Sequence, residues 1–429
     1  MKKSVIFLAF SLMALMACSK SEGIEDPITI TSPTPTEQIT KVSLTESQKG
    51  YVKAGNAMAM RFLKQIYEGE NLVCSPLSLQ YALAMAANGA SGETLQEIID
   101  FLGYGSDGID ALNAYSKILM EQLPAVDLNV TLKVTDAMLV NEKLPLLPAY
   151  KKMLADYYYA PAENMDFSDP EKVAARINDW ASRNTNGFID NILSSSDISP
   201  SAVAFLMNAL YFKARWAGSE YEPMFSEERT VDDSFTLSDG TVKTVKMMRN
   251  ERYHAYAEMD GFKVLALPYA GGKFFMYILL PDKNDLPALL NKLQTVTWED
   301  IQQNLKRDAE VHVKLPKFDI ENKFKLNESL KSLGVRRAFQ QGAAQFDRMF
   351  SCDPEYLFWI GKVIQKAKIT VAEWGTEAAA VTVVQMDGAS EAPGGEIKKV
   401  YFYADHPFVF AIGESTSGTI LFEGVFAGK

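Results

Sequence analysis

The chain has 429 residues, of which 47% are hydrophobic and 23% charged, a balance typical of a globular protein with a large buried core. Its formal net charge is −11. General nucleic-acid binders carry a basic stripe, so this acidic balance indicates that nucleic acid is not a partner.

The first 17 residues have the pattern of an export signal. Lys2 and Lys3 precede the apolar run VIFLAFSLMALM, which is too short for a comfortable membrane span. The run ends in LMAC, which resembles a bacterial lipoprotein signal in which Cys18 is lipidated and becomes the mature N-terminus. We therefore expect an exported protein, lipid-anchored through Cys18 to the membrane of the bacterial envelope, at the outer membrane or cell surface. A secreted or periplasmic protein and an uncleaved anchor are the alternatives.

Residues 18–44 mix Ser, Thr, Pro and acidic residues without helical periodicity. This composition predicts a flexible tether between the anchor and a globular domain over 45–429. Beyond Cys18 only Cys74 and Cys352 occur, too few for a disulfide framework. Cys74 lies among apolar residues, so we expect a buried thiol there.

Helical patterns dominate the first part of the domain. Apolar residues recur at helical spacing from Thr45 to about Gly69, and Pro76 begins a second such pattern that ends at Gly-Ala-Ser-Gly. Ser91 or Thr94 is expected to cap the next helix. Further helices are expected over 109–122, 148–158 and 170–183.

Strand-type runs dominate from the middle of the chain onwards. They are VTLKVTDAMLV, SAVAFLMNALYF, FKVLALPYA, KFFMYILLP, VHVKLPKFDI, KAKITVAEW, VYFYADHPFVFAIGE and GTILFEGVF. Helices come mainly first and strands mainly later, without βαβ alternation, which favours an α+β fold with mixed or antiparallel sheets. No Pro/Ser-rich linker interrupts 45–429, so the sequence indicates one large domain.

The sequence lacks the usual patterns of catalytic and metal sites. His254, His312 and His406 belong to neither an HExxH motif nor a Cys/His zinc spacing. The segment GESTSG, which begins at Gly413, misses the nucleophile-elbow pattern GxSxG by one residue. We therefore expect no enzyme activity, no cofactor and no metal. A hydrolase on an unfamiliar scaffold is the alternative, since sequence cannot pair the many acidic residues in space.

The stretch GTEAAAVTVV has the pattern of a strand in which one face carries small side chains. We call this face the slim face. Side chains alternate along a strand, so Thr376, Ala378, Ala380 and Thr382 share a face, and all four are small and uncharged. Glu377 falls on the other face. The breaker-rich DGASEAPGGE that follows is typical of a loop. A helix capped by Thr376 is the other interpretation of this segment.

Several blocks in chain order resemble the serpin family of protease inhibitors. NLVCSPLSLQYALAMAANGASGET is similar to the family's Ser-Pro-x-Ser helix start, and FLMNALYFKARW to its Asn-Ala-x-Tyr-Phe-Lys-x-x-Trp strand. ITVAEWGTEAAAVT resembles the hinge of the reactive loop, and DHPFVFAI and GTILFEGVF resemble the closing strands. Together the blocks span about 45–429.

The resemblance implies a serpin fold, with three β-sheets, about nine helices and an exposed reactive loop. In this family a protease attacks the loop as bait and forms an acyl-enzyme. The cut loop then inserts into the main sheet and distorts the protease before water releases it. A monomeric inhibitor of serine endopeptidases, elastase-like or subtilisin-like, or of cysteine endopeptidases is thus implied. A non-inhibitory serpin and a surface adhesion or carrier module are the alternatives.

This resemblance supplies a physical reason for the small, uncharged side chains on the slim face. A loop that slides between two strands cannot carry charge inward, because burying an unpaired charge costs several kcal/mol. Glycine at the start supplies the backbone freedom for the loop to turn into the sheet. The matching hinge residues are Gly375, Thr376, Glu377, Ala378, Ala379, Ala380, Val381 and Thr382.

Two further clusters are implied by the resemblance. The polar shutter beneath the centre of the sheet matches Ser75, Ser78 and Asn208, with Gln365 where the family usually has histidine. Glutamine donates and accepts hydrogen bonds as neutral histidine does, but it cannot become charged. The breach, where the loop begins to enter, matches Trp216 and an ion pair of Lys317 with Glu373.

The position of the bait bond depends on the direction of counting. Counting forward from the hinge places it at Ala389–Ser390, whereas counting back from Pro407 gives Glu396, seven residues further on. We favour the forward count, because trapping demands a fixed insertion length. A small residue such as Ala389 suits a protease with a shallow specificity pocket. The other candidates for the bait residue are Met386, Ala392, Lys398 and Lys399.

Overall fold

The computed structural model describes residues 34–199, 202–219, 222–351, 358–376 and 398–429. These residues form nine α-helices and three β-sheets, so the α+β prediction is confirmed. The helices are α1 Glu46–Ile66, α2 Pro76–Gly89, α3 Gly92–Leu102, α4 Gly108–Gln122, α5 Pro148–Tyr158, α6 Pro170–Asn184, α7 Leu286–Lys292, α8 Trp298–Asn304 and α9 Asn327–Ser332.

The three sheets are built mainly from antiparallel neighbours. The central sheet has the order β11 (Phe318–Lys325), β12 (Ile364–Ala372), β13 (Gly375–Thr376), β4 (Ala204–Arg215), β2 (Thr131–Asn141) and β3 (Ala162–Met165). A second sheet runs β1 (Leu72–Cys74), β16 (Ile420–Phe426), β15 (Phe408–Glu414), β9 (Phe274–Pro281), β8 (Phe262–Pro268) and β7 (Ala255–Met259). The third runs β14 (Lys399–Tyr403), β10 (Glu310–Pro316), β6 (Val242–Tyr253) and β5 (Val231–Thr236).

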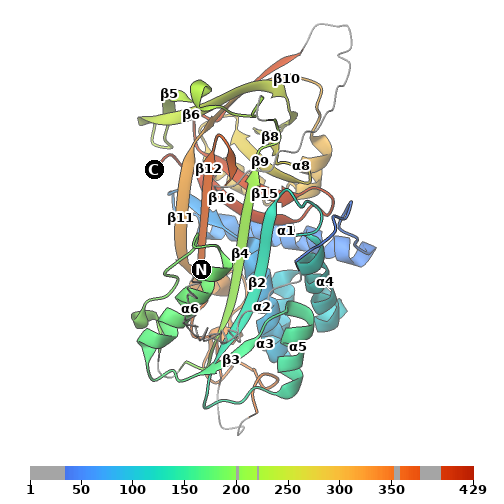
Figure 1. Ribbon diagram of the computed structural model, residues 1–429, viewed down its shortest axis with the longest axis vertical. Coiled ribbons are helices and arrows are strands. Elements are labelled where there is room, and N and C mark those ends of the chain that lie inside the picture. The colour runs from blue at the N-terminus through green and yellow to red at the C-terminus, as the bar shows by residue number, and fades with distance from the viewer. Residues whose placement is uncertain (1–33, 200–201, 220–221, 352–357, 377–397) are drawn as a thin grey trace, which may run out of the picture.

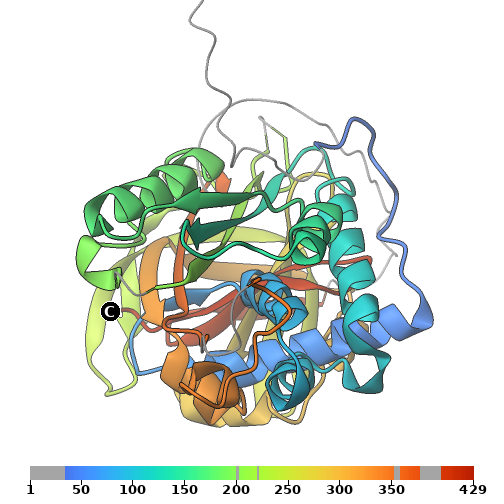
Figure 2. The same ribbon diagram turned by 90° about the horizontal axis from the view of Figure 1, so that it is seen from below.

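The central sheet lies between helices on both faces (Figure 1, Figure 2). On one face, α6 packs Ile177 and Trp180 against Met207 and Ala209 of β4. On the other face, α2 packs against β4 and β16, and its buried Leu79 and the other apolar residues of α2 join the main core. Alternate residues of β2 and β4 therefore enter two different apolar clusters, which explains why these strands are hydrophobic on both faces.

Helix ends follow the local chemistry of the sequence. Thr45 and Gln48 form a capping box at α1, and the Ser75 hydroxyl accepts from the Ser78 N–H at the start of α2, where Pro76 needs no partner for its nitrogen. Ser91 holds the cap position of α3, but its hydroxyl donates to Asp347 rather than capping the helix. The capping bond expected at that helix is therefore missing.

The run VHVKLPKFDI, which the sequence predicts to be one strand, forms two strands. β10 ends at Pro316 and β11 begins at Phe318, and the two strands belong to different sheets. Lys317 sits at the joint, where its N–H donates to the carbonyl of Lys246. Proline supplies no N–H to continue a ladder, so the pairing pattern changes at this point.

The segment 34–44, which the sequence assigns to the end of a tether, lies against the domain. Val42 is buried, and its N–H donates to Thr416 Oγ1 at 2.9 Å. The Ile39 N–H donates to the Ala125 carbonyl at 2.9 Å. The remainder of the tether and the signal, residues 1–33, lie outside the described residues.

Candidate functional site: a gap in the central sheet

The central sheet is joined in its middle by only two residues. Gly375 and Thr376 of β13 pair with Val371 and Ala372 of β12 on one side and with Ala214 and Arg215 of β4 on the other. Within the described residues, β12 and β4 share no other ladder. The sheet is therefore open along most of the length of these two strands.

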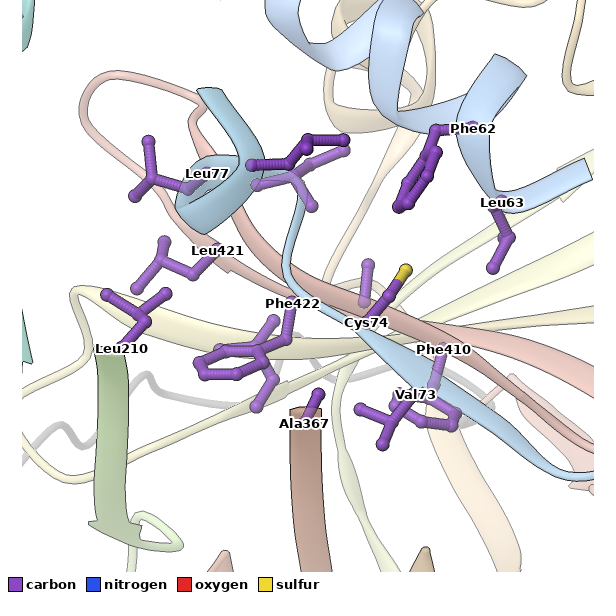
Figure 3. Packing of buried hydrophobic residues seen from close by; sticks show 14 of the residues in the cluster. Phe62, Leu63, Val73, Cys74, Leu77, Leu210, Ala367, Phe410, Leu421 and Phe422 are labelled. Atoms are coloured by element: carbon purple, nitrogen blue, oxygen red, sulfur yellow. The ribbon is translucent and has the colours of Figure 1, made fainter. Parts of the chain in front are cut away.

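A cavity of about 740 Å³ occupies this opening. Figure 3 shows Leu210 of β4 and Ala367 of β12 coming from separate strands, with the ring of Phe422 from β16 between them. Asn208 and Gln365 line the same cavity. We call this space, bounded by β4, β12 and the core beneath them, the gap.

Glycine is the one residue type that fits at position 375, at the entrance to the gap. Its φ is +146°, and a Cβ there would overlap the carbonyl oxygen of Ala214. Only glycine adopts this backbone conformation without strain and approaches the neighbouring strand this closely. The first hinge residue can therefore lie inside the sheet because it has no side chain.

Thr376 points into the core. It is 2% exposed, and its Oγ1 shares a 2.6 Å hydrogen bond with the hydroxyl of Tyr269. Because side chains alternate, this orientation fixes which face of a continuing strand would be turned inward. The face shared with Thr376 is the slim one.

Trp216 and Tyr269 form an aromatic stack next to the seated hinge. Their rings lie 4.7 Å apart and nearly parallel. The indole Nε1 donates to the carbonyl of Ala372 at 2.8 Å, and the Trp216 N–H donates to the carbonyl of Trp374. These contacts join the end of β4 to the turn between β12 and β13.

Lys317 and Glu373, expected to pair, lie in contact at this end of the gap. Lys317 Nζ lies 2.7 Å from Glu373 Oε2. Burial opposes ionisation of Glu373, but hydrogen bonds from Lys317, its own backbone and Thr230 outweigh it and lower the pKa of the carboxyl. The charge is therefore maintained although Glu373 is buried.

On one side of the gap, the shutter residues form a compact pair. The Ser75 N–H donates to Gln365 Oε1 at 3.2 Å, and Gln365 Nε2 donates back to the Ser75 carbonyl at 2.8 Å. The Ser75 hydroxyl donates to the carbonyl of Leu421 and accepts from the Ser78 N–H. Gln365 thus ties β12 to the start of α2.

Across the gap, Asn208 has a different partner, which the sequence did not predict. Its Nδ2 donates to Asp136 Oδ1 at 2.7 Å. Asp136 is 1% exposed, and burial raises the pKa of its carboxyl to about 7, although the Asn208 amide opposes the shift. An aspartate in the middle of the apolar run VTLKVTDAMLV was the available signal. The four predicted shutter residues therefore divide between two clusters that face one cavity.

Several predicted residues lie outside the described residues. They are the predicted lipidation site Cys18, the cysteine Cys352, the hinge residues Glu377, Ala378, Ala379, Ala380, Val381 and Thr382, and the predicted bait bond Ala389–Ser390. Cys74 is described, and burial raises the pKa of its thiol well above the ordinary value.

Other ligand or anchor sites were sought in the described part of the chain. No cluster of three or more His, Cys, Asp or Glu side chains there is arranged to hold a metal ion. None of its helices combines the length and apolar character needed to cross a bilayer.

Comparison with known proteins identifies the class. Residues 53–428 match the family model described as serpin (serine protease inhibitor). An uncharacterised serpin-like protein of Thermococcus kodakarensis is 30% identical, covering 99% of this chain and 98% of its own length. Human serpin B11 is 33% identical, covering 84% of this chain and 93% of its own length. The solved structure entitled cleaved serpin 42Da superposes with a TM-score of 0.78 at 28% identity, covering 89% of this chain and 99% of that one.

The chain belongs to the serpin family. Its three sheets and the nine helices of the described residues form the serpin fold, as the sequence predicts. Members of this family are mostly protease inhibitors rather than enzymes.

Proposed function

We propose that this protein is a monomeric inhibitor that traps serine, or cysteine, endopeptidases by inserting its cleaved reactive loop into the gap. The observation that carries the proposal is the seated hinge. Gly375 and Thr376 already occupy the first two positions of a missing strand between β12 and β4. Beyond them the gap is empty enough to form a cavity of about 740 Å³.

The register of β13 says where each further residue would arrive. Thr376 faces Val371 and Ala214, and β12 and β4 both run antiparallel to β13. In the same register Thr382 would lie between Gln365 and Asn208, and residue 386 would lie opposite Ala204, where β4 begins. Ten residues, 377–386, would thus complete the sheet.

The chemistry of the loop matches the two faces of the gap. The inward orientation of Thr376 would turn Ala378, Ala380 and Thr382 toward the core. Glu377 would face outward, next to Thr370 of β12 and Lys213 of β4 in the same register. The one charge of the hinge would therefore avoid the apolar interior and meet a cation.

Completion of the sheet is also the source of the driving force. A dozen or more main-chain hydrogen bonds at about 0.5–1.5 kcal/mol each would release on the order of 10 kcal/mol. This is comparable with the whole stability of a typical domain. The uncleaved state is therefore a kinetic trap, and the entrance residues Trp216, Lys317 and Glu373 and the shutter pairs are the contacts that insertion would rearrange.

We propose Ala389–Ser390 as the bait bond, and the position of the other candidates Lys398 and Lys399 supports this choice. The Glu310 N–H donates to the Lys398 carbonyl, and Lys399 already belongs to β14. Lys399 thus lies in the third sheet and Lys398 is hydrogen-bonded to it, which disfavours a trypsin-like target. We propose elastase-like or subtilisin-like targets that prefer a small residue such as Ala389.

Incubation with such a protease tests the proposal. We expect an SDS-stable complex of the two chains, and mass spectrometry should place the new N-terminus at Ser390. Cleavage without a complex would instead assign a non-inhibitory serpin, and turnover of substrate by the protein alone would assign a hydrolase. Cuts confined to 397–400 would refute the chosen bond.

We also propose that the protein is exported and anchored through a lipid on Cys18. The support is the signal-like pattern of residues 1–17 and the position of Cys18 at its end. Wild-type protein expressed in a bacterium should incorporate labelled palmitate and enter the detergent phase, whereas Cys18→Ser should do neither. Unlabelled wild-type protein in the medium would favour plain secretion.

A further inference from the structure

Asp136 belongs to β2, and its side chain lies beneath the central sheet without a charged partner. No salt bridge to it is formed within the described residues, and its Oδ2 has no hydrogen-bond partner. The groups around it are the Asn208 amide from β4, the Tyr81 hydroxyl from α2 and the Tyr158 hydroxyl from α5, with Tyr115 of α4 behind Tyr81. None of these groups is a cation.

Asp136 and Asn208 stand opposite each other in the β2–β4 pair and are joined by one hydrogen bond. The other terminal atom of each side chain, Asp136 Oδ2 and Asn208 Oδ1, is buried without a partner. Two such oxygens cannot bond to each other, but a protonated carboxyl donates to an amide oxygen. A single proton on Asp136 therefore supplies the donor that both atoms lack.

The proton is available near neutral pH. Burial raises the pKa of Asp136 to about 7, so the acid is mostly neutral below that pH and mostly ionised above it. When it ionises, the second hydrogen bond is lost and an unpaired charge remains in the interior. Such a charge is relieved by water, which reaches Asp136 from the gap if β4 loosens from β2.

We propose that Asp136 and Asn208 form a proton-controlled latch on the gap. The neutral acid and the amide pair at two points and hold β4 in place, and ionisation releases this wall of the gap. β4 therefore loosens from β2, and the gap widens more readily, as the pH rises through neutrality. The effect of the latch on inhibition rests on the function proposed above, but the opening of the gap itself does not.

Hydrogen exchange of the full-length protein at pH 5.5 and 8.5 tests the latch. The rates are corrected for intrinsic exchange and compared with those of the buried strands β8 and β9, which do not contain Glu423. Loss of one hydrogen bond between β2 and β4 should lower the protection of these two strands by about three- to tenfold at the higher pH. In Asp136→Asn an amide supplies the donor at every pH, so protection at pH 8.5 should equal that at pH 5.5. Glu423→Gln, which removes a different buried acid with a raised pKa, should behave as the wild type.

Protection of β4 that is independent of pH in the wild type, or an unchanged pH dependence in Asp136→Asn, would overturn the proposal. Carbon-13 NMR titration of the aspartate carboxyls needs no variant to fold. One carboxyl should titrate near pH 7 in the wild type, and titration of every aspartate below pH 5 would also overturn it.

A separate measurement connects the latch to inhibition. If the proposed function is correct, uncleaved protein stored without protease should lose inhibitory activity faster at pH 8.5 than at 5.5, and Asp136→Asn should remove the difference. A protein that never forms a protease complex would refute the proposed function. The exchange experiment would still decide whether the latch exists.

Discussion

Thr376 is the residue at which the reactive loop meets the core. It is already buried against Tyr269, although the rest of the hinge lies outside the described residues. In the proposed mechanism, a side chain at this position has to suit both the uncleaved protein and the form with the loop inserted. Small size and a single hydroxyl meet both demands, because the hydroxyl finds a partner and no charge is carried inward.

Replacing Thr376 with arginine should convert the inhibitor into a substrate. The guanidinium would have to enter a space that is 2% exposed, at a cost of several kcal/mol. We expect the covalent complex to fall at least tenfold on SDS gels, while cleavage at the bait bond continues. Glu377→Arg places the same charge on the outward face and is the matched control. Equal complex formation by wild type and Thr376→Arg would refute the inward orientation.

Glu423 is a second buried acid, and it weakens the fold at alkaline pH. It pairs with Cys74 across β16 and β1, and burial raises the pKa of its carboxyl to about 8 although a weak hydrogen bond from the Cys74 thiol opposes the shift. The native state therefore holds a proton that the unfolded chain releases near its ordinary pKa of 4.5. Stability from this group is fully present below about pH 4.5 and is lost as the pH rises through about 8.

Replacing Glu423 with methionine should remove that loss. The apolar side chain fits an interior strand whose seven residues are all buried. We expect an apparent melting temperature at pH 8.5 that is at least about 3 °C above the wild type, with a smaller gain at pH 5. Calorimetry at the two pH values measures the difference. A gain that is larger at pH 5 would contradict the assigned protonation.

At the scale of the element, the central sheet is defined by which strand lies next to which. β4 and β12 come from segments about 160 residues apart, and only β13 joins them. The slim face of the hinge is visible in the sequence because strand alternation is local. The gap is not visible, because it depends on the positions of α2, α6 and β16 around two strands that do not pair.

Gly375→Ala should unseat β13. A Cβ at this position overlaps the backbone of β4 and demands a φ that alanine rarely adopts. We expect more molecules of inhibitor to be consumed per protease trapped, by at least about twofold, because entry begins at this residue, and faster hydrogen exchange at Ala214 and Arg215. Gly361→Ala is the control, since a Cβ there meets no atom within 4 Å. Indistinguishable behaviour of the two variants would contradict the seated hinge.

In the proposed mechanism, the whole molecule stores free energy in an incomplete central sheet. The open architecture on which the proposed inhibition depends leaves a cavity of about 740 Å³ between β4 and β12, lined by apolar side chains and two small polar clusters. Close packing is the rule in protein interiors, so a void of this size is a cost that completion of the sheet would remove.

Cutting the loop should therefore make the protein more resistant to heat. With about 10 kcal/mol released, the apparent melting temperature of protein cleaved at Ala389–Ser390 should rise by at least about 15 °C. Differential scanning calorimetry of intact and cleaved samples measures this. Protein cut at a site outside 377–400 is the control. A cleaved form no more stable than the intact one would show that the loop stays outside the sheet.

The sequence by itself determined the elements, the family and the alternation that keeps Glu377 off the slim face, because these depend on spacing between near neighbours in the chain. It also predicted that Lys317 and Glu373 lie together, through a resemblance rather than through physics. Only the tertiary structure decided that Asn208 pairs with Asp136 and that Glu423 lies in the core. Those two acids acquire their raised pKa values from distant segments that exclude water from them, and no local pattern records that exclusion.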